Sequence, residues 1–492
     1  MSDCDSIEDL AASLDDYICQ YAAITSTLLR VRKTILGSVR LSRKCPSHVR
    51  RRKFYQKYEF HNCYGRFYIA VINGRIPFKK VLDKLRAEVR EKHLECGILD
   101  SFEGAEDVEE FAEKCGVEPL TKDTVDVDAA VDDIIEQPTK DLANIKFVHK
   151  SDPEYLSLEM TKERYEEMIS FARTFAIERL DKDEAESASL ATKLFKLCIA
   201  CYITASSPLY WGFGPKVYQF VAENLNARLE GYASPFNHTL VTYCSPFCLD
   251  MVFGSLGSVY GPAVTREVRR LVEELRPDER VMLVLNPPYL ESELVNCADR
   301  VSELVSIDER IRVMSIVPQW DDAPGIQTLR GEDGRLKGFL AEDRLLGKYD
   351  HYYWDYQKWR PINAKFGSRL LVYSKSGNVT TDERGKVDEL LGIMKKQPDE
   401  EVSLMSESPI LRVPSDDPGP REDNLGWAEY FMALAHVTAM RSKDPSTQVG
   451  AVIVNHENKV VGIGYNGFPS MGEIDNDALL NWGKKGDKPI ES

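Results

Sequence analysis

A short apolar run at residues 281–285 leads directly into Asn286, Pro287, Pro288 and Tyr289, a combination of polar, stiff and aromatic residues. The exocyclic amine of adenine is a weak nucleophile because its lone pair is delocalised into the ring. The side-chain oxygen of Asn286 and the backbone carbonyl of Pro287 can each accept one N–H of such an amine. The prolines stiffen the turn, and the ring of Tyr289 offers a stacking face worth about 1–3 kcal/mol. The tetrad therefore predicts a site that holds a base amine for reaction.

A strand that merely ends at a double proline is the alternative, because such pairs mark loops wherever they occur. From ordinary residue frequencies, a tetrad of this kind arises by chance in a chain of this length with a probability of roughly a few per cent. The tetrad also follows a buried-type strand, and open α/β sheets bind ligands at the carboxyl ends of their strands. Both observations favour the functional interpretation.

A second segment, which begins at Glu230, carries the features needed for a methyl donor. Glycine permits close backbone approach, and Gly254 and Gly257 follow an acidic strand. Taken singly, either glycine indicates no more than a tight turn. The distance of about thirty residues to the tetrad fits one crossover helix, near residues 263–275, between two parallel strands. The order of the two segments therefore predicts a βαβ unit with a donor loop and a substrate loop.

Together these segments resemble the phosphorylated-CTD-interacting-factor family, the cap-specific adenosine N6-methyltransferases of eukaryotic messenger RNA. The resemblance covers about residues 155–376. It is carried by an acidic residue before Ala233-Ser234-Pro235-Phe236-Asn237, then Tyr243-Cys244-Ser245, Asp250 with Phe253-Gly254-Ser255, the tetrad, and Pro318-Gln319-Trp320.

This resemblance implies a Rossmann-like methyltransferase sheet, S-adenosylmethionine as the cofactor, and a tetrad, Asn286 to Tyr289, that holds the target adenine. Gln319 stands where the family usually has an acid, and Tyr289 where Phe is commoner. No Trp-rich WW module is found before residue 150, although the best-known members dock on the polymerase tail through one. The resemblance further implies that the donor site is lined by Pro235, Phe236, Asn237, Asp250, Phe253 and Gly254.

Composition limits the classes of protein to be considered. A chain of 492 residues with 43% hydrophobic content can bury two or three cores. We find no apolar stretch near twenty residues and no leader-like N-terminus, so membrane insertion and secretion are not expected. Eleven scattered cysteines indicate reduced thiols in the nucleus, which we favour, or the cytosol. Cys198 and Cys201 are interpreted as buried helix thiols rather than a metal pair, and no metal is expected.

The net charge of −16 hides a strong segregation of charge along the chain. No Asp or Glu occurs from residue 30 to residue 57, and Arg50, Arg51, Arg52 and Lys53 are followed at once by aromatic residues. Such a segment suits phosphate attraction and base stacking. A solvated helix face or a nuclear-import signal is an equally good interpretation.

Residues 352–360 form an unusually aromatic stretch. Its rings could clasp a methylguanosine cap, with Asp355 at the edge of the base. A plain aromatic core is the favoured alternative, because so many rings must be packed somewhere. Lys358 and Arg360 are better suited to phosphates than to a core, and we predict that they contact RNA.

Near the C-terminus, residues 427–434, 441–454 and 462–469 resemble the opening of a deoxycytidylate deaminase, in which Asn466 would contact the nucleotide. Deamination in that family needs zinc held by His and two Cys, with a Glu that moves protons. The last cysteine is Cys297, and His456 lacks the required pattern. We therefore expect no deaminase activity from the chain as given. A truncated sequence, a further tail and a degenerate accessory domain would each produce this ending.

The predicted fold is α/β, with a Rossmann-like methyltransferase sheet, a helical N-terminal region and an incomplete cytidine-deaminase-like segment. The predicted divisions are a basic helical region (1–96), an acidic connector (97–150), a helical lead-in (151–204), a methyltransferase domain (205–380), a linker (381–423) and the partial deaminase-like domain (424–492).

The predicted function is S-adenosylmethionine-dependent methylation of adenosine N6 in RNA, at the cap-adjacent (2′-O-methyl)adenosine. The partners would be capped RNA beginning in adenosine and the transcription machinery. Two alternatives remain open: a DNA adenine N6-methyltransferase, and a noncatalytic RNA- or polymerase-binding scaffold. A bifunctional nucleotide enzyme is weakened by the missing zinc ligands, and the oligomeric state is left open.

Overall fold

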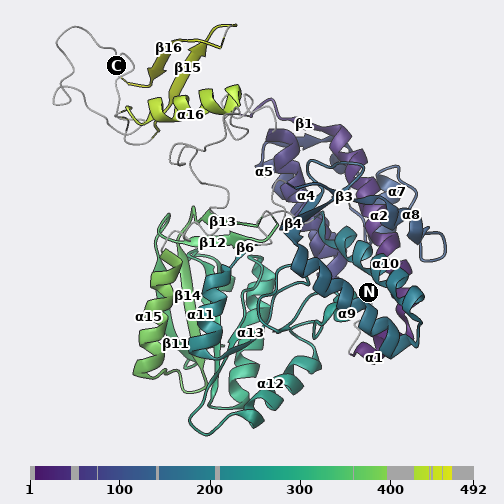
Figure 1. The fold of residues 1–492 in the computed structure, drawn as a ribbon, viewed down its shortest axis with the longest axis vertical. Coiled ribbons are helices and arrows are strands. Elements are labelled where there is room, and N and C mark those ends of the chain that lie inside the picture. Colours follow the sequence, from purple (N-terminus) through teal and green to yellow (C-terminus); the bar gives the residue numbers. More distant parts are fainter. Residues whose placement is uncertain are drawn as a thin grey trace, which may run out of the picture. The chain divides into compact units, whose positions relative to one another are not determined.

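The computed structural model describes residues 6–45, 55–74, 76–102, 104–139, 143–204, 211–357, 359–395, 426–442, 444, 447–456 and 458–467. The chain divides into two units, residues 1–399 and residues 400–492. Figure 1 labels their helices and strands. In the described parts of the chain, no helix has both the length and the apolar character needed to cross a membrane.

The N-terminal part of the first unit is helical, as its sequence predicts. Its longest helix, α2, buries residues around most of its circumference because other helices pack on several of its sides. The hydroxyl of Tyr64 donates to the carbonyl of Leu28 at 2.6 Å, and so ties α4 to α2. The elements are α1 (Ile7–Ala12), α2 (Leu14–Ser38), β1 (Val39–Leu41), α4 (Tyr55–Asn73), α5 (Phe78–Glu91) and β2 (Leu94–Cys96).

The acidic stretch at residues 97–150, which the sequence led us to expect as a connector, is folded into this unit. Its carboxylates lie largely on exposed positions, while Phe111, Val131 and Ile134 are buried. Interleaved apolar residues give it a packed side despite its charge. It forms α6 (Gly97–Asp100), α7 (Val108–Lys114), α8 (Val127–Asp132), β3 (Ile134–Gln137) and β4 (Asn144–His149), and β5 (Ser157–Thr161) completes an antiparallel sheet with β3 and β4.

Two capped helices lead into the central sheet. The side chain of Thr161 accepts the N–H of Arg164 at the start of α9 (Lys162–Leu180). Asp183 accepts the N–H of Glu186 in the same way at the start of α10 (Glu184–Tyr202). Such caps satisfy backbone donors that have no partner within the helix. The C-terminal half of α10 is buried, and its last residue reaches the pocket described below.

A six-stranded sheet forms the centre of the unit, in the order β11-β14-β10-β9-β7-β8. Neighbours from β8 to β10 are parallel, whereas β14 is antiparallel to both β10 and β11. Every residue of β9 and β10 is buried, as expected of strands covered on both faces. The strands are β7 (Ala227–Glu230), β8 (Thr242–Tyr243), β9 (Val281–Val284), β10 (Ile311–Pro318), β11 (Leu340–Leu346) and β14 (Ser368–Ser374).

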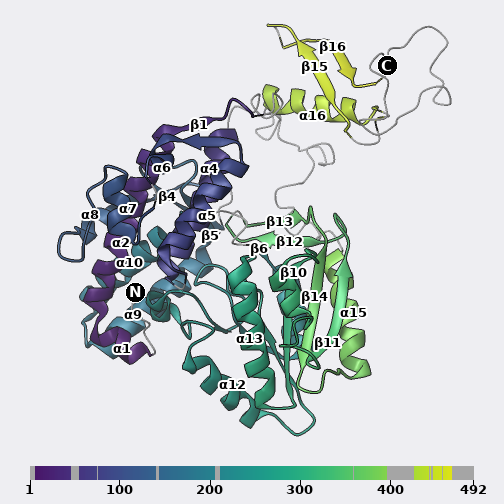
Figure 2. The ribbon, with the colours of Figure 1, turned by 180° about the vertical axis from the view of Figure 1, so that it is seen from behind.

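Helices cover both faces of this sheet. In Figure 1, α11 (Pro215–Leu225) and α15 (Thr381–Lys395) lie over one face, and Figure 2 shows α12 (Pro262–Glu274) and α13 (Glu291–Ile307) over the other. The helix α15 lies within the predicted linker, 381–423, but it buries Val387, Leu390 and Met394 against the sheet. The rest of that linker, residues 396–423, lies outside the described residues.

The remaining described elements are smaller. A three-stranded sheet contains β6 (Trp211–Gly212), β12 (Tyr352–Asp355) and β13 (Arg360–Asn363), and α14 (Pro324–Leu329) contacts α13. The second unit contains α16 (Trp427–Ala439) and an antiparallel hairpin of β15 (Gly450–Val454) and β16 (Val460–Tyr465). The fold of the described chain is therefore mixed α/β, as predicted.

Candidate functional site

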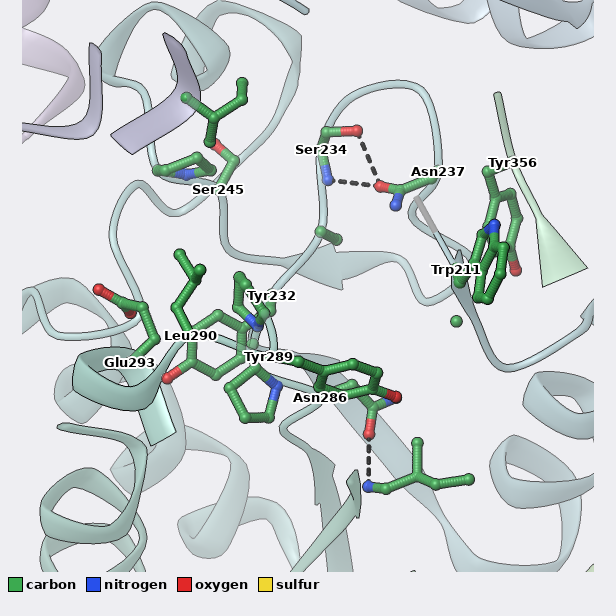
Figure 3. Close-up of a pocket in the computed structure, with 18 of the residues that line it drawn as sticks. Trp211, Tyr232, Ser234, Asn237, Ser245, Asn286, Tyr289, Leu290, Glu293 and Tyr356 are labelled. Carbon is green, nitrogen blue, oxygen red and sulfur yellow. Dashed lines mark hydrogen bonds between the residues drawn. The ribbon is translucent and has the colours of Figure 1, made fainter. Parts of the chain in front are cut away.

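A cavity of about 440 Å³ lies at the carboxyl ends of the parallel strands β7, β9 and β10. Cavities of this size are typical of ligand sites, which range over about 300–1,000 Å³. Figure 3 shows many of the residues that line it. They come from each strand end and from α4, α5, α10 and α13, and so from widely separated parts of the sequence.

All four residues of the predicted tetrad line this cavity. The side-chain oxygen Oδ1 of Asn286 accepts the backbone N–H of Ile316 on β10 at 3.0 Å (Figure 3). Its Nδ2 is buried and makes no hydrogen bond with the described residues. An amide oxygen has two lone pairs, so Oδ1 keeps an acceptor position for a ligand.

Aromatic rings surround Tyr289 in this cavity. The ring centroid of Tyr289 lies 6.1 Å from that of Trp320 and 6.3 Å from that of Phe366, and both contacts are edge-to-face. Trp320 follows β10 and keeps 43% of its surface exposed. Trp211 and Tyr356 add two further rings to the cavity wall. This arrangement offers flat apolar surfaces of the kind on which a base stacks.

Glu230 stands at the end of β7 and is 4% exposed. Its carboxylate accepts the hydroxyl of Tyr218 at 2.6 Å and the backbone N–H groups of Thr239 and Leu240 at 2.8 and 3.3 Å. Burial raises the pKa of this carboxyl to about 7, although these hydrogen bonds oppose the shift. The side chain thereby ties the loop after β7 back to the strand and places a titratable group in the cavity wall.

The loop after β7 passes close to β9 at Gly231. A Cβ built on this residue would lie 2.4 Å from Leu285 Cδ2, so any other residue here would have to displace the buried Leu285 side chain. Farther along, Oδ1 of Asn237 accepts the N–H of Ser234 at 2.7 Å and its hydroxyl at 2.8 Å (Figure 3). These bonds form a local turn that brings Ser234 and Asn237 to the cavity wall.

The six residues predicted to line a donor site do not all reach the cavity. Asn237 lines it, whereas Pro235, Phe236 and Phe253 are buried in the protein interior and do not. Gly254 has a φ of +93° and ends a short helix, η2 (Cys248–Phe253), away from the cavity lining. This glycine therefore serves the turn that its sequence position also predicts.

Asp250 is also absent from the cavity lining, but it contacts a residue that lines it. It is 1% exposed, and its Oδ2 accepts the hydroxyl of Tyr202 at 2.5 Å. Burial raises the pKa of this carboxyl to about 7. Tyr202 lies at the end of α10 and forms part of the cavity wall. Through this hydrogen bond, Asp250 holds Tyr202 in position in the cavity wall.

The predicted RNA contacts are only partly described. Arg50, Arg51, Arg52, Lys53 and Lys358 lie outside the described residues. Arg360 is exposed at the start of β13 and does not line the cavity.

The neighbouring aromatic stretch forms a core for the most part. Tyr353, Trp354 and Tyr356 are nearly inaccessible. This matches the aromatic core that the sequence favoured over an open clasp for a cap.

Several lining residues escaped the sequence analysis. Arg66, Lys84 and Glu88 come from α4 and α5, and Arg66 pairs with Glu88 at 2.9 Å. Nothing in the local sequence links these helices to a tetrad about two hundred residues away. Trp211 could have been noticed as an isolated aromatic residue just before the sheet, but its position in the wall depends on pairing with β12.

The second unit shows no comparable site in its described residues. Oδ1 of Asn466 accepts the N–H of Val449 at 2.7 Å, and its Nδ2 donates to the carbonyl of Thr447 at 2.8 Å. These bonds hold the segment before β15. Across the described chain, no group of three or more His, Cys, Asp or Glu residues could hold a metal. The two histidines of this segment, His436 and His456, are exposed, and no cysteine follows Cys297 in the sequence.

Comparison with known families gives two matches. Residues 179–355 match the family described as "Phosphorylated CTD interacting factor 1 WW domain". The matched range holds α10, both loops of the cavity and most of the central sheet. Residues 425–474 match "Cytidine and deoxycytidylate deaminase zinc-binding region". Both resemblances predicted from the sequence are therefore confirmed over these residues.

Individual relatives match the C-terminal part. Deoxycytidylate deaminase of Mus musculus is 54% identical over 72 residues, which are 15% of this chain and 39% of the mouse protein. The Homo sapiens enzyme is 51% identical over 72 residues, 15% of this chain and 39% of the human protein. A probable deoxycytidylate deaminase of Drosophila melanogaster is 48% identical over 68 residues, 14% of this chain and 30% of the fly protein. The chain spans less than two fifths of the length of each.

Proposed function

We propose that the first unit is an S-adenosylmethionine-dependent methyltransferase that acts on the N6 amine of adenosine in RNA. The observation that carries this proposal is that Asn286 and Tyr289, at the end of β9, share one cavity with the loop that follows β7. A base amine and a methyl donor could both be held there. The match of residues 179–355 to the phosphorylated-CTD-interacting-factor family supports the same assignment.

The sheet supports a Rossmann-like interpretation. The connection from β7 to β9 contains β8 and α12, and the connection from β9 to β10 contains α13, so helices connect parallel strands that lie side by side in the sheet. In such sheets, ligands bind outside the carboxyl ends of the strands. The cavity lies at that edge, and helices cover both faces, as in doubly wound folds.

One set of residues would bind the methyl donor at one end of the cavity, and another set would bind the base at the other end. Gly231, Ser234, Asn237 and Glu230 would hold the donor, because they surround the end of β7 with backbone and polar groups. The donor, when bound, supplies a methyl group activated by a positively charged sulfur. Asn286 would accept one N–H of the base, and the backbone carbonyl that follows it would accept the other.

Most of the acceleration would come from positioning. Holding the reacting groups in line converts a bimolecular step into an effectively unimolecular one. The stiff double proline and the rings around Tyr289 would fix the plane of the base. The proton that leaves the methylated nitrogen would pass to solvent, and no metal is required.

We further propose that the substrate is capped RNA beginning in adenosine and that the protein works in the nucleus beside the transcription machinery. The name of the matched family, a factor that interacts with the phosphorylated CTD, supports this setting. The expected product is N6-methyladenosine next to the cap.

The test uses the full chain with isotopically labelled S-adenosylmethionine. Four substrates of matched sequence are compared: capped RNA, uncapped RNA, single-stranded DNA and double-stranded DNA. Mass spectrometry of the digested nucleosides should show labelled N6-methyladenosine from capped RNA, with little from the others. Methylation of DNA alone would identify a DNA adenine methyltransferase. Saturable donor binding with no transfer to any substrate would identify a scaffold, and both results would overturn the proposal.

A further inference from the structure

A chain of four side chains runs from the cavity into the interior. The hydroxyl of Tyr289 donates to the hydroxyl of Tyr353 at 3.2 Å, and Tyr353 lies 2.7 Å from Oγ of Ser368. Ser368 in turn lies 2.8 Å from Nε2 of His351. Tyr353, Ser368 and His351 are all buried. The cavity residue Tyr289 is therefore the only member of this chain that a ligand can reach.

The far end of this chain fixes the direction of its hydrogen bonds. Nδ1 of His351 lies 3.1 Å from the carbonyl oxygen of Gly347, which can only accept, so Nδ1 carries the proton. Burial lowers the pKa of His351, which keeps the ring neutral even though Asp350 opposes this shift. In the neutral ring, Nε2 must then accept a proton from Ser368.

The remaining directions follow because each hydroxyl has a single proton. Ser368 donates to His351 and so accepts from Tyr353, and Tyr353 accepts from Tyr289. The hydroxyl of Tyr289 therefore donates its one proton to Tyr353 and has none left to donate to a ligand. Its oxygen can meet a ligand only as an acceptor, and both Tyr289 and Asn286 line the cavity.

From this geometry we infer that Tyr289 is a specificity-determining residue. Its hydroxyl, held as an acceptor by Tyr353, Ser368 and His351, selects a base that brings N–H donors over one that brings a carbonyl. This inference rests on the proposed function and names a recognition element within that site. The family's commoner Phe at this position has a ring but no oxygen, so it could not make this distinction.

The expected selectivity follows from the acceptors around the amine. Oδ1 of Asn286, the carbonyl of Pro287 and the hydroxyl of Tyr289 would all face the substituent at position 6 of a purine. The two N–H groups of an amine can pair with two of these three acceptors, a hydrogen pairs with none of them, and an oxo group repels them. Sites built to pair with a polar group reject analogues that lack it, and for one acceptor we expect about a tenfold effect.

The test measures binding of three capped RNAs whose first nucleoside is adenosine, purine riboside or inosine, with S-adenosylhomocysteine present. Fluorescence anisotropy should give the affinity order adenosine, purine riboside, inosine. In Tyr289→Phe the adenosine preference should fall about tenfold, and in Ser368→Ala it should fall part of the way. Tyr352→Phe, a neighbouring tyrosine outside the chain of hydroxyls, should keep the wild-type ratio.

Thermal melting of each variant checks that the fold is kept. An adenosine preference in Tyr289→Phe equal to that of the wild type would overturn this inference, and methyl transfer by the wild type would then leave the proposed function standing. If none of the three RNAs binds and no methyl is transferred, the proposed function and this inference fail together.

Discussion

The two units of the chain use apolar residues in very different ways. In the first, every residue of β9 and β10 is buried between helices. In the second, Ile453 and Ile463 of the hairpin are 63% and 66% exposed, and Thr438 is the only buried residue in the described part. Apolar residues at strand spacing form strands in both units. Burial needs a second and third layer, which the described part of the second unit lacks.

This difference also explains where a site can form. The carboxyl ends of several parallel strands, covered on both faces, leave an enclosed space at the edge of the sheet. A helix beside a two-stranded hairpin encloses no such space. Within the described chain, the cavity, the buried carboxyls of Glu230 and Asp250, and the unpaired amide of Asn286 all belong to the first unit.

The largest expected contrast is in local stability. Backbone amides of β9 and β10 should exchange with deuterium about a thousandfold more slowly than those of β15 and β16, after correction for intrinsic rates. The hairpin opens without exposing a core, whereas opening the sheet exposes one. Mass spectrometry of peptides from the full chain gives both rates. Equal protection of the two sets of amides from exchange would show that the hairpin is covered in solution. It would contradict the difference in burial between the two units.

The next largest contrast is in the effect on stability of replacing one aliphatic residue in each unit by alanine. Leu283→Ala, at a fully buried position, should lower the free energy of unfolding by about 2–5 kcal/mol. Ile463→Ala removes an exposed side chain and should change it by less than about 0.5 kcal/mol. Urea unfolding followed by circular dichroism measures both. A large loss at Ile463 would show that its exposed face has a partner.

Substitution of one glycine in each unit extends the comparison to the candidate site. Gly231→Ala would force a Cβ against Leu285 and should cost about 1–3 kcal/mol of stability. Gly464→Ala meets no atom within 4 Å, so the change should stay within about 1 kcal/mol. The Gly231 variant should also weaken donor binding, because the loop after β7 must move. If the Gly231 variant bound the donor as tightly as the wild type, the loop after β7 would not be part of the donor site.

The buried carboxyl of Glu230 predicts a smaller, pH-dependent effect. Its pKa is raised in the folded state to about 7, so folding takes up a proton between its ordinary pKa and that value. This contribution is fully present below about pH 4.5 and is lost as the pH rises through about 7. Glu230→Gln should therefore reduce the fall in stability between pH 5 and pH 8 by about 1–3 kcal/mol. Glu429→Gln, at an exposed position, is the control and should leave the slope unchanged.

The strand before the tetrad and the position of the tetrad at its end were predictable from the sequence because their features are local. An apolar run that ends at a double proline specifies a buried strand and the stiff turn after it. The spacing of about thirty residues from Gly257 to Asn286 leaves room for one crossover helix, and α12 occupies that place. The acidic stretch was harder to interpret, because its net charge drew attention away from the apolar positions that Phe111 and Val131 bury.

The part of the cavity wall formed by the loop after β7 could not be predicted at the same level. Whether a loop residue faces the cavity depends on turns such as the one between Ser234 and Asn237, and Phe236 and Asp250 face the interior instead. The wall contributed by α4 and α5 depends on packing between segments about two hundred residues apart. No pattern within a single segment carries that information.

The most direct test of the central claim is the rate of methyl transfer by Asn286→Ala, measured beside donor binding. Capped RNA beginning in adenosine is the substrate, and Gln219→Ala, an exposed residue on α11, is the matched control. We expect Asn286→Ala to lose about a hundredfold or more in transfer rate while donor affinity is kept, and the control to match the wild type. Transfer at the wild-type rate in Asn286→Ala would contradict the assignment of this cavity as the site of reaction.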